Sequence, residues 1–433
     1  MIATVIMKRT LTAVLAIVIP GLFAVVGIEV MRGRATAQAS APVANTAEQV
    51  RNGAYLARAG NCMGCHTVRG GKEYAGGRAL ATPFGNIYTS NLTPDVATGL
   101  GSWTPDDFWR AIHHGKSKDG SFLYPAFPFP NYTKVTRSDA DAMFAYFRTL
   151  APVNQQNREP ELRFPYNQRI LLAFWRTLYF TAGEYQPEPK QSAEWNRGAY
   201  LVQGLGHCSA CHSARNALGG SIAEQRLGGG IIPMQNWYAS SLASDPVTGL
   251  GGWEVTDVAD LLKIGTSQRG TVFGPMAEVV GESLQHVSGG DIRSMAIYLK
   301  SLPASAADNS GTSVQPNGEA QAILRQGAGL YEQQCATCHG ANGTGMPPAY
   351  PRLAANRHLA GDTPINLIRI VLNGGYPPST GGNPRPYGMP PFGHTLSDAE
   401  VAAVASYVRR SWGNQGGLVS AVEVSRLRGA PAD

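Results

Sequence analysis

Cys62-Met63-Gly64-Cys65-His66 has two further copies in this chain, Cys208-Ser209-Ala210-Cys211-His212 and Cys335-Ala336-Thr337-Cys338-His339. The three copies hold all 6 cysteines of the 433 residues. C-x-x-C-H is the attachment signature of c-type haem: the thiols form thioethers with the haem vinyl groups, and the histidine becomes an axial iron ligand. A redox dithiol or half of a zinc site needs no histidine after each copy. The sequence therefore predicts three covalent haems c, on Cys62, Cys65, Cys208, Cys211, Cys335 and Cys338, with His66, His212 and His339 as proximal ligands.

The composition is that of a globular protein. Hydrophobic residues make up 43% of the chain, and the formal net charge is +6. Three haems carry about six propionates that offset this charge, and the chain has no basic run, so we do not expect it to bind nucleic acid. No cysteine is left for a disulfide. Since haem c is attached outside the cytoplasmic membrane, we expect the protein on the periplasmic side.

Residues 1–37 are expected to bring the chain to the membrane. Lys8 and Arg9 precede an uncharged run from Thr10 to Ile28, close to the roughly 20 residues that span a bilayer. The run is longer than the core of a usual signal peptide, which favours an uncleaved membrane anchor. The alternative is a signal peptide with Ala35-Thr36-Ala37 as its cleavage site.

The chain repeats itself around the first two haem motifs, which predicts two homologous domains. Each motif follows a similar pentapeptide, and each is followed by an identical tetrapeptide and then a tryptophan. The matching segments are Asn52-Gly53-Ala54-Tyr55-Leu56 with Arg197-Gly198-Ala199-Tyr200-Leu201, Thr98-Gly99-Leu100-Gly101 with Thr248-Gly249-Leu250-Gly251, and Trp103 with Trp253. The region of the third motif follows the same plan at lower similarity, with a last helix from Ser397 to Trp412.

We therefore expect a mostly α-helical protein with three cytochrome-c-type haem domains in tandem and long loops. They are residues 45–152 (unit one), 195–303 (unit two) and 318–413 (unit three). A connector, 153–194, contains an aromatic run from Ile170 to Phe180 that is predicted to be a helix, packed on its own domains or touching the membrane or a partner. A flexible linker, 304–317, and a C-terminal tail, 414–433, complete the chain.

Two methionines are in the position of a second axial ligand. Electron-carrying haems c usually have a methionine there, from a Pro-rich loop before the last helix, because the soft thioether stabilises Fe(II). Met389 occupies this position in unit three and Met276 in unit two. Their rivals, Met346 and Met234, lie on earlier loops. The predicted distal loops are Gly388-Met389-Pro390-Pro391-Phe392 and Gly274-Pro275-Met276-Ala277.

Unit one departs from this pattern, because Phe127 stands where unit two has its methionine. Phenylalanine does not ligate iron. A histidine, His113 or His114, is preferred as the sixth ligand, with His114 slightly ahead. The alternatives are Met143 from the last helix, whose neighbours favour packing, or a five-coordinate iron.

These motifs, the loop Tyr124-Pro125-Ala126-Phe127-Pro128-Phe129-Pro130 and the Met389 loop resemble a known family. It is the trihaem cytochrome c subunit of membrane-bound periplasmic alcohol, aldehyde, gluconate, sorbitol and fructose dehydrogenases. The resemblance covers about residues 45 to 413. It implies a large catalytic subunit with a molybdenum, pyrroloquinoline quinone or flavin cofactor, a possible small subunit, and electron delivery to ubiquinone in the membrane. It also implies the three proximal histidines, Met276 and Met389. Many members have methionine at the position of Phe127.

The predicted function is electron transfer without substrate chemistry in this chain, which lacks a Gly-rich nucleotide loop and a separate catalytic domain. Two alternatives remain open at this point. One is a peroxidase-like enzyme at the atypical first haem. The other is a cytochrome subunit of a terminal oxidase.

Overall fold

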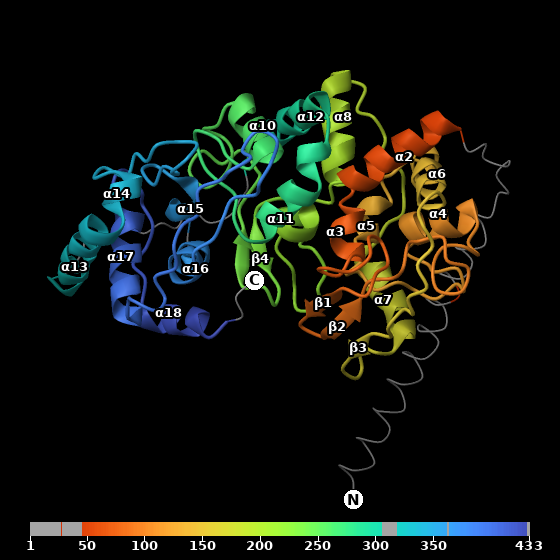
Figure 1. Ribbon diagram of the computed structural model, residues 1–433, viewed down its shortest axis with the longest axis horizontal. Helices are drawn as coiled ribbons and strands as arrows, with labels where there is room; N and C mark the ends of the chain where they lie inside the picture. The colour runs from red at the N-terminus through yellow and green to blue at the C-terminus, as the bar shows by residue number, and fades with distance from the viewer. Residues whose placement is uncertain (1–26, 28–45, 305–317, 362, 431–433) are drawn as a thin grey trace, which may run out of the picture.

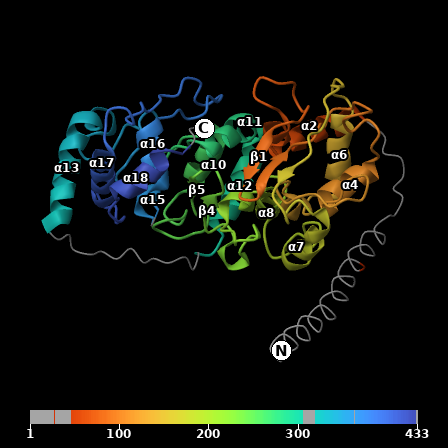
Figure 2. The ribbon, with the colours of Figure 1, turned by 90° about the horizontal axis from the view of Figure 1, so that it is seen from below.

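The computed structural model describes residues 27, 46–304, 318–361 and 363–430. Units one, two and three follow one another in a row, from the orange end through green to blue (Figure 1). Seen from below, the order is the same, with unit two between the other two (Figure 2). Apart from Gly27, the predicted membrane segment lies outside the described residues, as does most of the predicted linker.

The regular secondary structure is mostly helical, as predicted, and two small sheets were not expected. Unit one comprises α2 (Ala47–Ala59), α3 (Cys62–His66), β1 (Ala79–Thr82), β2 (Gly85–Tyr88), α4 (Pro105–His114), α5 (Phe129–Tyr132) and α6 (Arg137–Phe147). The connector adds β3 (Glu161–Leu162), the 3-10 turn η1 (Arg169–Leu171) and α7 (Leu172–Tyr179). The sheet order is β1-β2-β3, with antiparallel pairs. Strands of two to four residues leave no alternation to detect in the sequence.

Unit two repeats the plan of unit one. It comprises α8 (Ala193–Gln203), α9 (Ser209–His212), η2 (Ala223–Gln225), β4 (Gly230–Ile232), β5 (Trp237–Ala239), α10 (Val255–Ile264), α11 (Pro275–Glu282), η3 (Leu284–His286) and α12 (Gly289–Lys300). Unit three has α13 (Gly318–Gln334), α14 (Ala336–His339), α15 (Arg357–Ala360), α16 (Ile365–Asn373) and α17 (Asp398–Arg410), followed by α18 (Ala421–Arg428).

In each unit the first long helix crosses the last one at a glycine. A Cβ atom at this glycine would overlap a carbonyl oxygen of the partner helix, so only glycine allows the backbones to come this close. The distance from such a Cβ atom to the carbonyl oxygen would be 1.8 Å for Gly53 and Ala142, 1.9 Å for Gly198 and Ser294, and 2.1 Å for Gly327 and Ala403. The three crossings are α2 with α6, α8 with α12, and α13 with α17.

The last helix of each unit starts in the same way. Thr136, Ser288 and Ser397 are N-caps, and each accepts a hydrogen bond from the backbone three residues later. The residue at that later position is acidic in all three units: Asp139, Asp291 and Glu400. Such a cap satisfies a free N–H at the helix start and favours an acidic side chain there.

Units one and two meet across a joint that uses equivalent residues twice (the 1–2 joint). The Tyr55 hydroxyl of unit one donates to Asp291 of unit two at 2.6 Å. The Tyr200 hydroxyl of unit two donates to Asp139 of unit one at 2.5 Å. The two units are therefore paired about an approximate twofold axis. Arg197 adds two hydrogen bonds to Asp291, at 2.8 and 2.7 Å.

Units two and three meet differently, through contacts that have no equivalent in the 1–2 joint (the 2–3 joint). Tyr238 of β5 exchanges two backbone hydrogen bonds with the Asn366 side chain of α16. Arg357 donates to the Ser241 carbonyl at 2.8 Å, and the ring of His358 lies 2.7 Å from the Ser240 hydroxyl. No approximate symmetry relates these contacts.

The connector and the C-terminal segment both pack on the folded units. In α7, Ala173 and Arg176 are buried, while Leu178 is 67% exposed, so the helix has one packed face and one open face. In α18, Val424 is fully buried. The Arg428 side chain there donates to Asp398 at 2.7 Å. The segment predicted as a tail thus contributes to the core of unit three.

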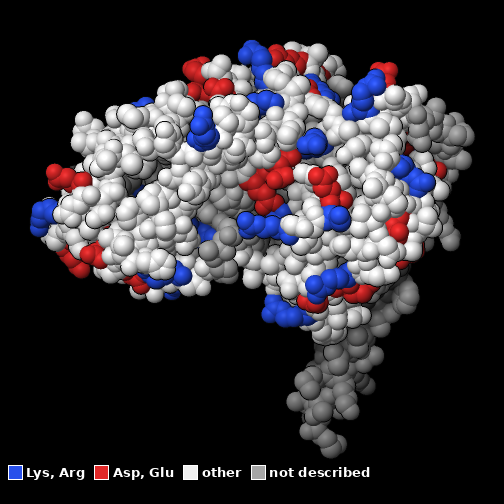
Figure 3. Space-filling model, in the orientation of Figure 1, with Lys and Arg blue, Asp and Glu red and all other residues white. Residues whose placement is uncertain are grey.

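In the described ranges, no helix has the length and apolar character needed to cross a membrane. On the face shown in Figure 3, acidic and basic side chains lie beside one another, and unit three presents a broad area without charges.

Candidate haem-binding sites

Each C-x-x-C-H motif ends in a short helix. Its histidine makes the same contact in all three units, a hydrogen bond from Nδ1 to a backbone carbonyl. Nδ1 of His66 lies 2.6 Å from the Ser90 carbonyl, Nδ1 of His212 lies 2.7 Å from the Ser240 carbonyl, and Nδ1 of His339 lies 2.9 Å from the Pro351 carbonyl. A carbonyl only accepts, so Nδ1 carries the proton and Nε2 keeps its lone pair. Such a hydrogen bond orients a metal-binding histidine. Sequence reasoning did not find the three acceptors, because a backbone carbonyl has no residue signature.

In each motif, burial favours the neutral thiol of the first cysteine. Burial raises the pKa of Cys62 and of Cys208 to about 12, and that of Cys335 to about 11. Redox-active C-x-x-C pairs have the opposite shift, towards a low pKa. In the part of the chain that the structure describes, no three His, Cys, Asp or Glu side chains gather into a metal site. The residues present thus fit a haem group better than a dithiol or zinc site.

The 1–2 joint brings the first two motifs close together. Burial raises the pKa of Cys65, and the nearby Cys211 thiol of unit two adds a small further rise. Helix α11, which carries Met276, contacts α3, and its Glu278 pairs with Arg78, which also donates to the Gly64 carbonyl. In the reverse direction, Asn131 of α5 donates to the Ser209 hydroxyl of α9 at 2.8 Å.

The two predicted methionine ligands are partly buried, and their rivals are exposed. Met276 is the second residue of α11 and packs against the core shared by units one and two. Met389 packs against the core of unit three, and its backbone exchanges two hydrogen bonds with Gly375. Met346 is 65% exposed and Met234 is 54% exposed. The packing therefore favours Met276 and Met389.

In unit one, Phe127 occupies the position of Met276. It packs on Tyr132, which lies beside the cysteines of the first motif. Its ring centroid lies 5.3 Å from that of Tyr132. The Tyr132 hydroxyl donates to the Gly60 carbonyl at 2.9 Å, and burial, followed by the nearby Cys62 and Cys65 thiols, raises the Tyr132 pKa.

The two candidate histidines of unit one lie at the end of α4 and are neutral. The ring of His113 stacks on Trp109 at 4.3 Å, and burial lowers its pKa to about 4. Burial, and then the charges of Lys116 and Arg176, lower the pKa of His114 to about 4. Nε2 of His114 is buried without a hydrogen-bond partner among the described residues.

Met143, the other alternative, is a core residue. It is 2% exposed, at the crossing of α2 and α6. The equivalent position of unit two, at the crossing of α8 and α12, is Met295, also 2% exposed. The same residue in two equivalent cores favours packing over iron ligation.

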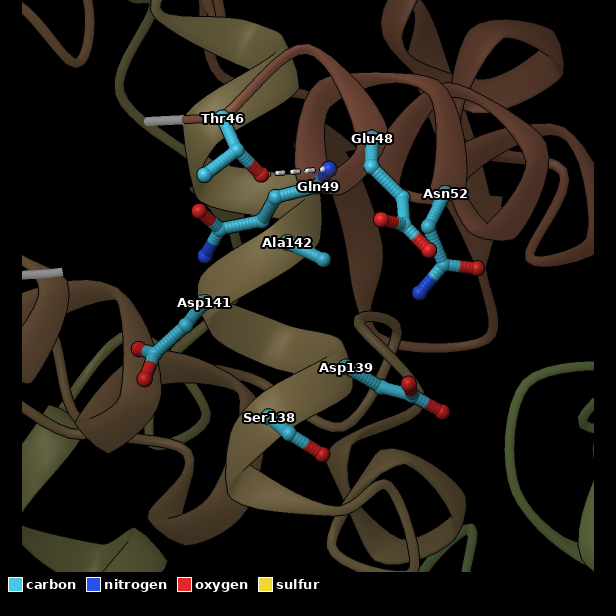
Figure 4. Close-up of a pocket in the computed structure, with 8 residues that line it drawn as sticks. All are labelled: Thr46, Glu48, Gln49, Asn52, Ser138, Asp139, Asp141 and Ala142. Atoms are coloured by element: carbon cyan, nitrogen blue, oxygen red, sulfur yellow. Dashed lines mark hydrogen bonds between the residues drawn. The ribbon is translucent and has the colours of Figure 1, made fainter. Parts of the chain in front are cut away.

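A surface depression at the N-terminal ends of α2 and α6 contains none of the residues of these sites. It is lined at the α2 and α6 ends by Thr46, Glu48, Gln49, Asn52, Ser138, Asp139, Asp141 and Ala142 (Figure 4). Asp139 in this depression is the residue that accepts from Tyr200 across the 1–2 joint.

Comparison with known proteins supports the cytochrome interpretation. The family model "Cytochrome c" matches residues 50–151, and the model "Cytochrome C oxidase, cbb3-type, subunit III" matches residues 322–408. The gluconate 2-dehydrogenase cytochrome c subunit of Pantoea cypripedii is 41% identical over 394 residues, which is 88% of this chain and 89% of the relative.

Two further relatives extend the comparison. The cytochrome c subunit of the quinone alcohol dehydrogenase of Gluconacetobacter polyoxogenes is 38% identical over 92% of this chain and 88% of its own length. The fructose dehydrogenase cytochrome subunit of Gluconobacter japonicus is 35% identical over 88% of this chain and 82% of its own length. The resemblance predicted from the sequence is thus confirmed: the chain belongs to the family of cytochrome c subunits of gluconate, alcohol and fructose dehydrogenases, and its cytochrome c domains carry covalent haem c.

Proposed function

We propose that this chain carries three covalent haems c and conducts electrons from a periplasmic dehydrogenase to ubiquinone in the membrane. The observation that carries the proposal is the threefold repetition of one arrangement. In each motif, two cysteines precede a histidine whose Nδ1 is hydrogen-bonded to a backbone carbonyl. Each haem would supply an iron that accepts and releases one electron.

The protein's part is to hold each iron and to set its preference for the reduced state. Nε2 of His66, His212 and His339 would be the proximal ligands. Met276 and Met389 would be the distal ligands in units two and three, where a thioether favours Fe(II). For the first haem we propose His114, because its Nε2 is neutral, buried and without a partner among the described residues. A bis-histidine site would have a lower potential than the other two.

The packing of the units suggests how electrons move. Close contact of the first two motifs across the 1–2 joint favours rapid exchange between their haems. Cys338 is the exposed cysteine among the six, whereas the other five are partly buried. The third haem is therefore the best placed for exchange with a partner outside this chain.

The partner is proposed from the relatives, whose names assign them to gluconate, alcohol and fructose dehydrogenases. We propose a large catalytic subunit with a molybdenum, pyrroloquinoline quinone or flavin cofactor, and a small subunit beside it. The assembly would sit on the periplasmic side of the cytoplasmic membrane, held there in part by residues 1–37.

Purification of the native complex tests this function. The expected result is a dehydrogenase subunit bound to this chain, three haems per chain by mass, and reduction of a ubiquinone analogue by the electron donor of that subunit. Co-purification with haem-copper subunits would instead support a terminal oxidase. Rapid peroxide turnover by the isolated chain would support an enzyme at the first haem.

A further inference from the structure

A positive charge from unit three is buried beside the second haem motif. The Ser240 carbonyl accepts from Nδ1 of His212, and the next carbonyl, that of Ser241, accepts from Arg357 at 2.8 Å. Arg357 begins α15 of unit three and is 8% exposed. Its guanidinium lies 4.9 Å from the ring centroid of Trp253, a buried residue of unit two.

This arginine has more hydrogen-bond donors than acceptors around it. A guanidinium has five N–H donors, and a buried one is costly unless it is paired with an anion. Nε of Arg357 is buried and has no partner among the described residues. Burial lowers the pKa of Arg357 to about 10, so the group remains charged at neutral pH. Within the described ranges, no carboxylate pairs with the Arg357 guanidinium.

Unit one provides an internal comparison, because uncharged groups pack on its equivalent loop. The Ser90 carbonyl accepts from His66, as Ser240 does from His212. The next residue, Asn91, is covered by the connector: its N–H donates to the Asn157 side chain at 2.8 Å, and its side chain donates to the Val153 carbonyl at 2.8 Å. The arginine is thus specific to the loop of unit two.

We propose that Arg357, although it belongs to unit three, is part of the haem site of unit two. Its guanidinium pairs with a carboxylate of that haem and raises the haem's reduction potential. Oxidation adds a positive charge to the iron, and a buried cation nearby opposes this change. The potential of the second haem then depends on the docking of unit three. This inference rests on the proposed haem at Cys208 and Cys211.

Spectroelectrochemical titration of the full-length holoprotein tests the proposal. In Arg357→Gln, one of the three midpoint potentials should fall by about 59 mV or more, a tenfold change in a one-electron equilibrium. Arg357→Lys keeps the charge but not the forked geometry, so its fall should be smaller. A separate Met276→His variant identifies the wave of the second haem. Resonance Raman spectra should show an altered propionate bending mode in both Arg357 variants.

Two matched controls separate pairing from general charge or packing effects. Arg385→Gln removes an exposed charge of unit three, and Asn157→Ala alters the cover of unit one; both should leave the wave of the second haem in place. Three haems by mass with unchanged midpoints and Raman modes in Arg357→Lys and Arg357→Gln would overturn the proposal. A wild-type mass with no haem at Cys208 and Cys211 would instead overturn the proposed function.

Discussion

The loops that receive His66 in unit one and His212 in unit two begin with the same contact and are covered by different parts of the chain. The connector covers the first loop with amide and backbone groups around Asn157. Unit three covers the second with Arg357 and His358. Duplication thus keeps the position of the proposed iron ligand, while the residues packed on the loop determine the charge around it. Two proposed haem sites with the same scaffold can therefore differ in reduction potential.

The scaffold shared by the two units can be tested at its closest approach. Gly53→Ala and Gly198→Ala each place a Cβ within 2 Å of a carbonyl oxygen, so the crossing helices must separate. Each change should lower the free energy of unfolding by about 3 kcal/mol or more, measured by urea denaturation. Gly183→Ala is the control, because a Cβ there meets nothing within 4 Å. A difference above about 1 kcal/mol between the two variants would contradict the equivalence of the crossings.

The distal ligands offer the sharpest test of where the units differ. Methionine bound to Fe(III) gives a weak far-red absorption band. Met276→Ala and Met389→Ala should each remove about half of this band, and the double variant should remove all of it. Phe127→Met should increase the intensity of the band, because it gives unit one a methionine at the position of the proposed ligand of unit two. Survival of the band in the double variant would mean that another methionine binds iron, and the assignments would be wrong.

The two tyrosine–aspartate hydrogen bonds of the 1–2 joint are equivalent, but we expect the two aspartates to contribute differently to stability. Asp291 accepts from Tyr55 across the joint and also from Arg197 of its own unit, whereas its equivalent Asp139 accepts across the joint from Tyr200. Hydrogen bonds to a charged group contribute about 1.5–3 kcal/mol, and less where the partner is exposed, as Arg197 is at 36%. Asp291→Ala should therefore cost about 2 kcal/mol and Asp139→Ala about 1 kcal/mol in urea unfolding. Equal losses of unfolding free energy would mean that the hydrogen bonds from Arg197 add no stability.

Much of this arrangement could be predicted from the sequence, because it depends on repeated local signals. The cysteine motifs, the glycine and tyrosine of the pentapeptides and the N-caps Thr136, Ser288 and Ser397 recur at matching places. The structure explains the repeated pentapeptide: its glycine lies at a helix crossing and its tyrosine in the 1–2 joint.

The remaining features depend on long-range contacts that have no local pattern. Arg357 lies in a short helix of unit three, far along the chain from the Ser241 carbonyl that it binds. The packing of Val424 into unit three was also not predicted, because the sequence after Asn414 indicated only a C-terminal tail. In both cases the partner surface, rather than the sequence of the segment, determines the outcome.

The smallest expected effect is the pH dependence of the 1–2 joint. Burial alone would raise the pKa of Asp291, but hydrogen bonds from Arg197 and Tyr55 outweigh it and hold the pKa below the usual 3.8. A carboxyl with a lowered pKa in the folded state stabilises the fold above its unfolded pKa, and this contribution is lost as the pH falls through the folded value. The difference in unfolding free energy between wild type and Asp291→Ala should be constant from pH 7 to about pH 5 and shrink below about pH 4. Urea titrations at several pH values measure this difference. A difference that stays the same at pH 3 would mean that Asp291 contributes through its packing and not through its charge.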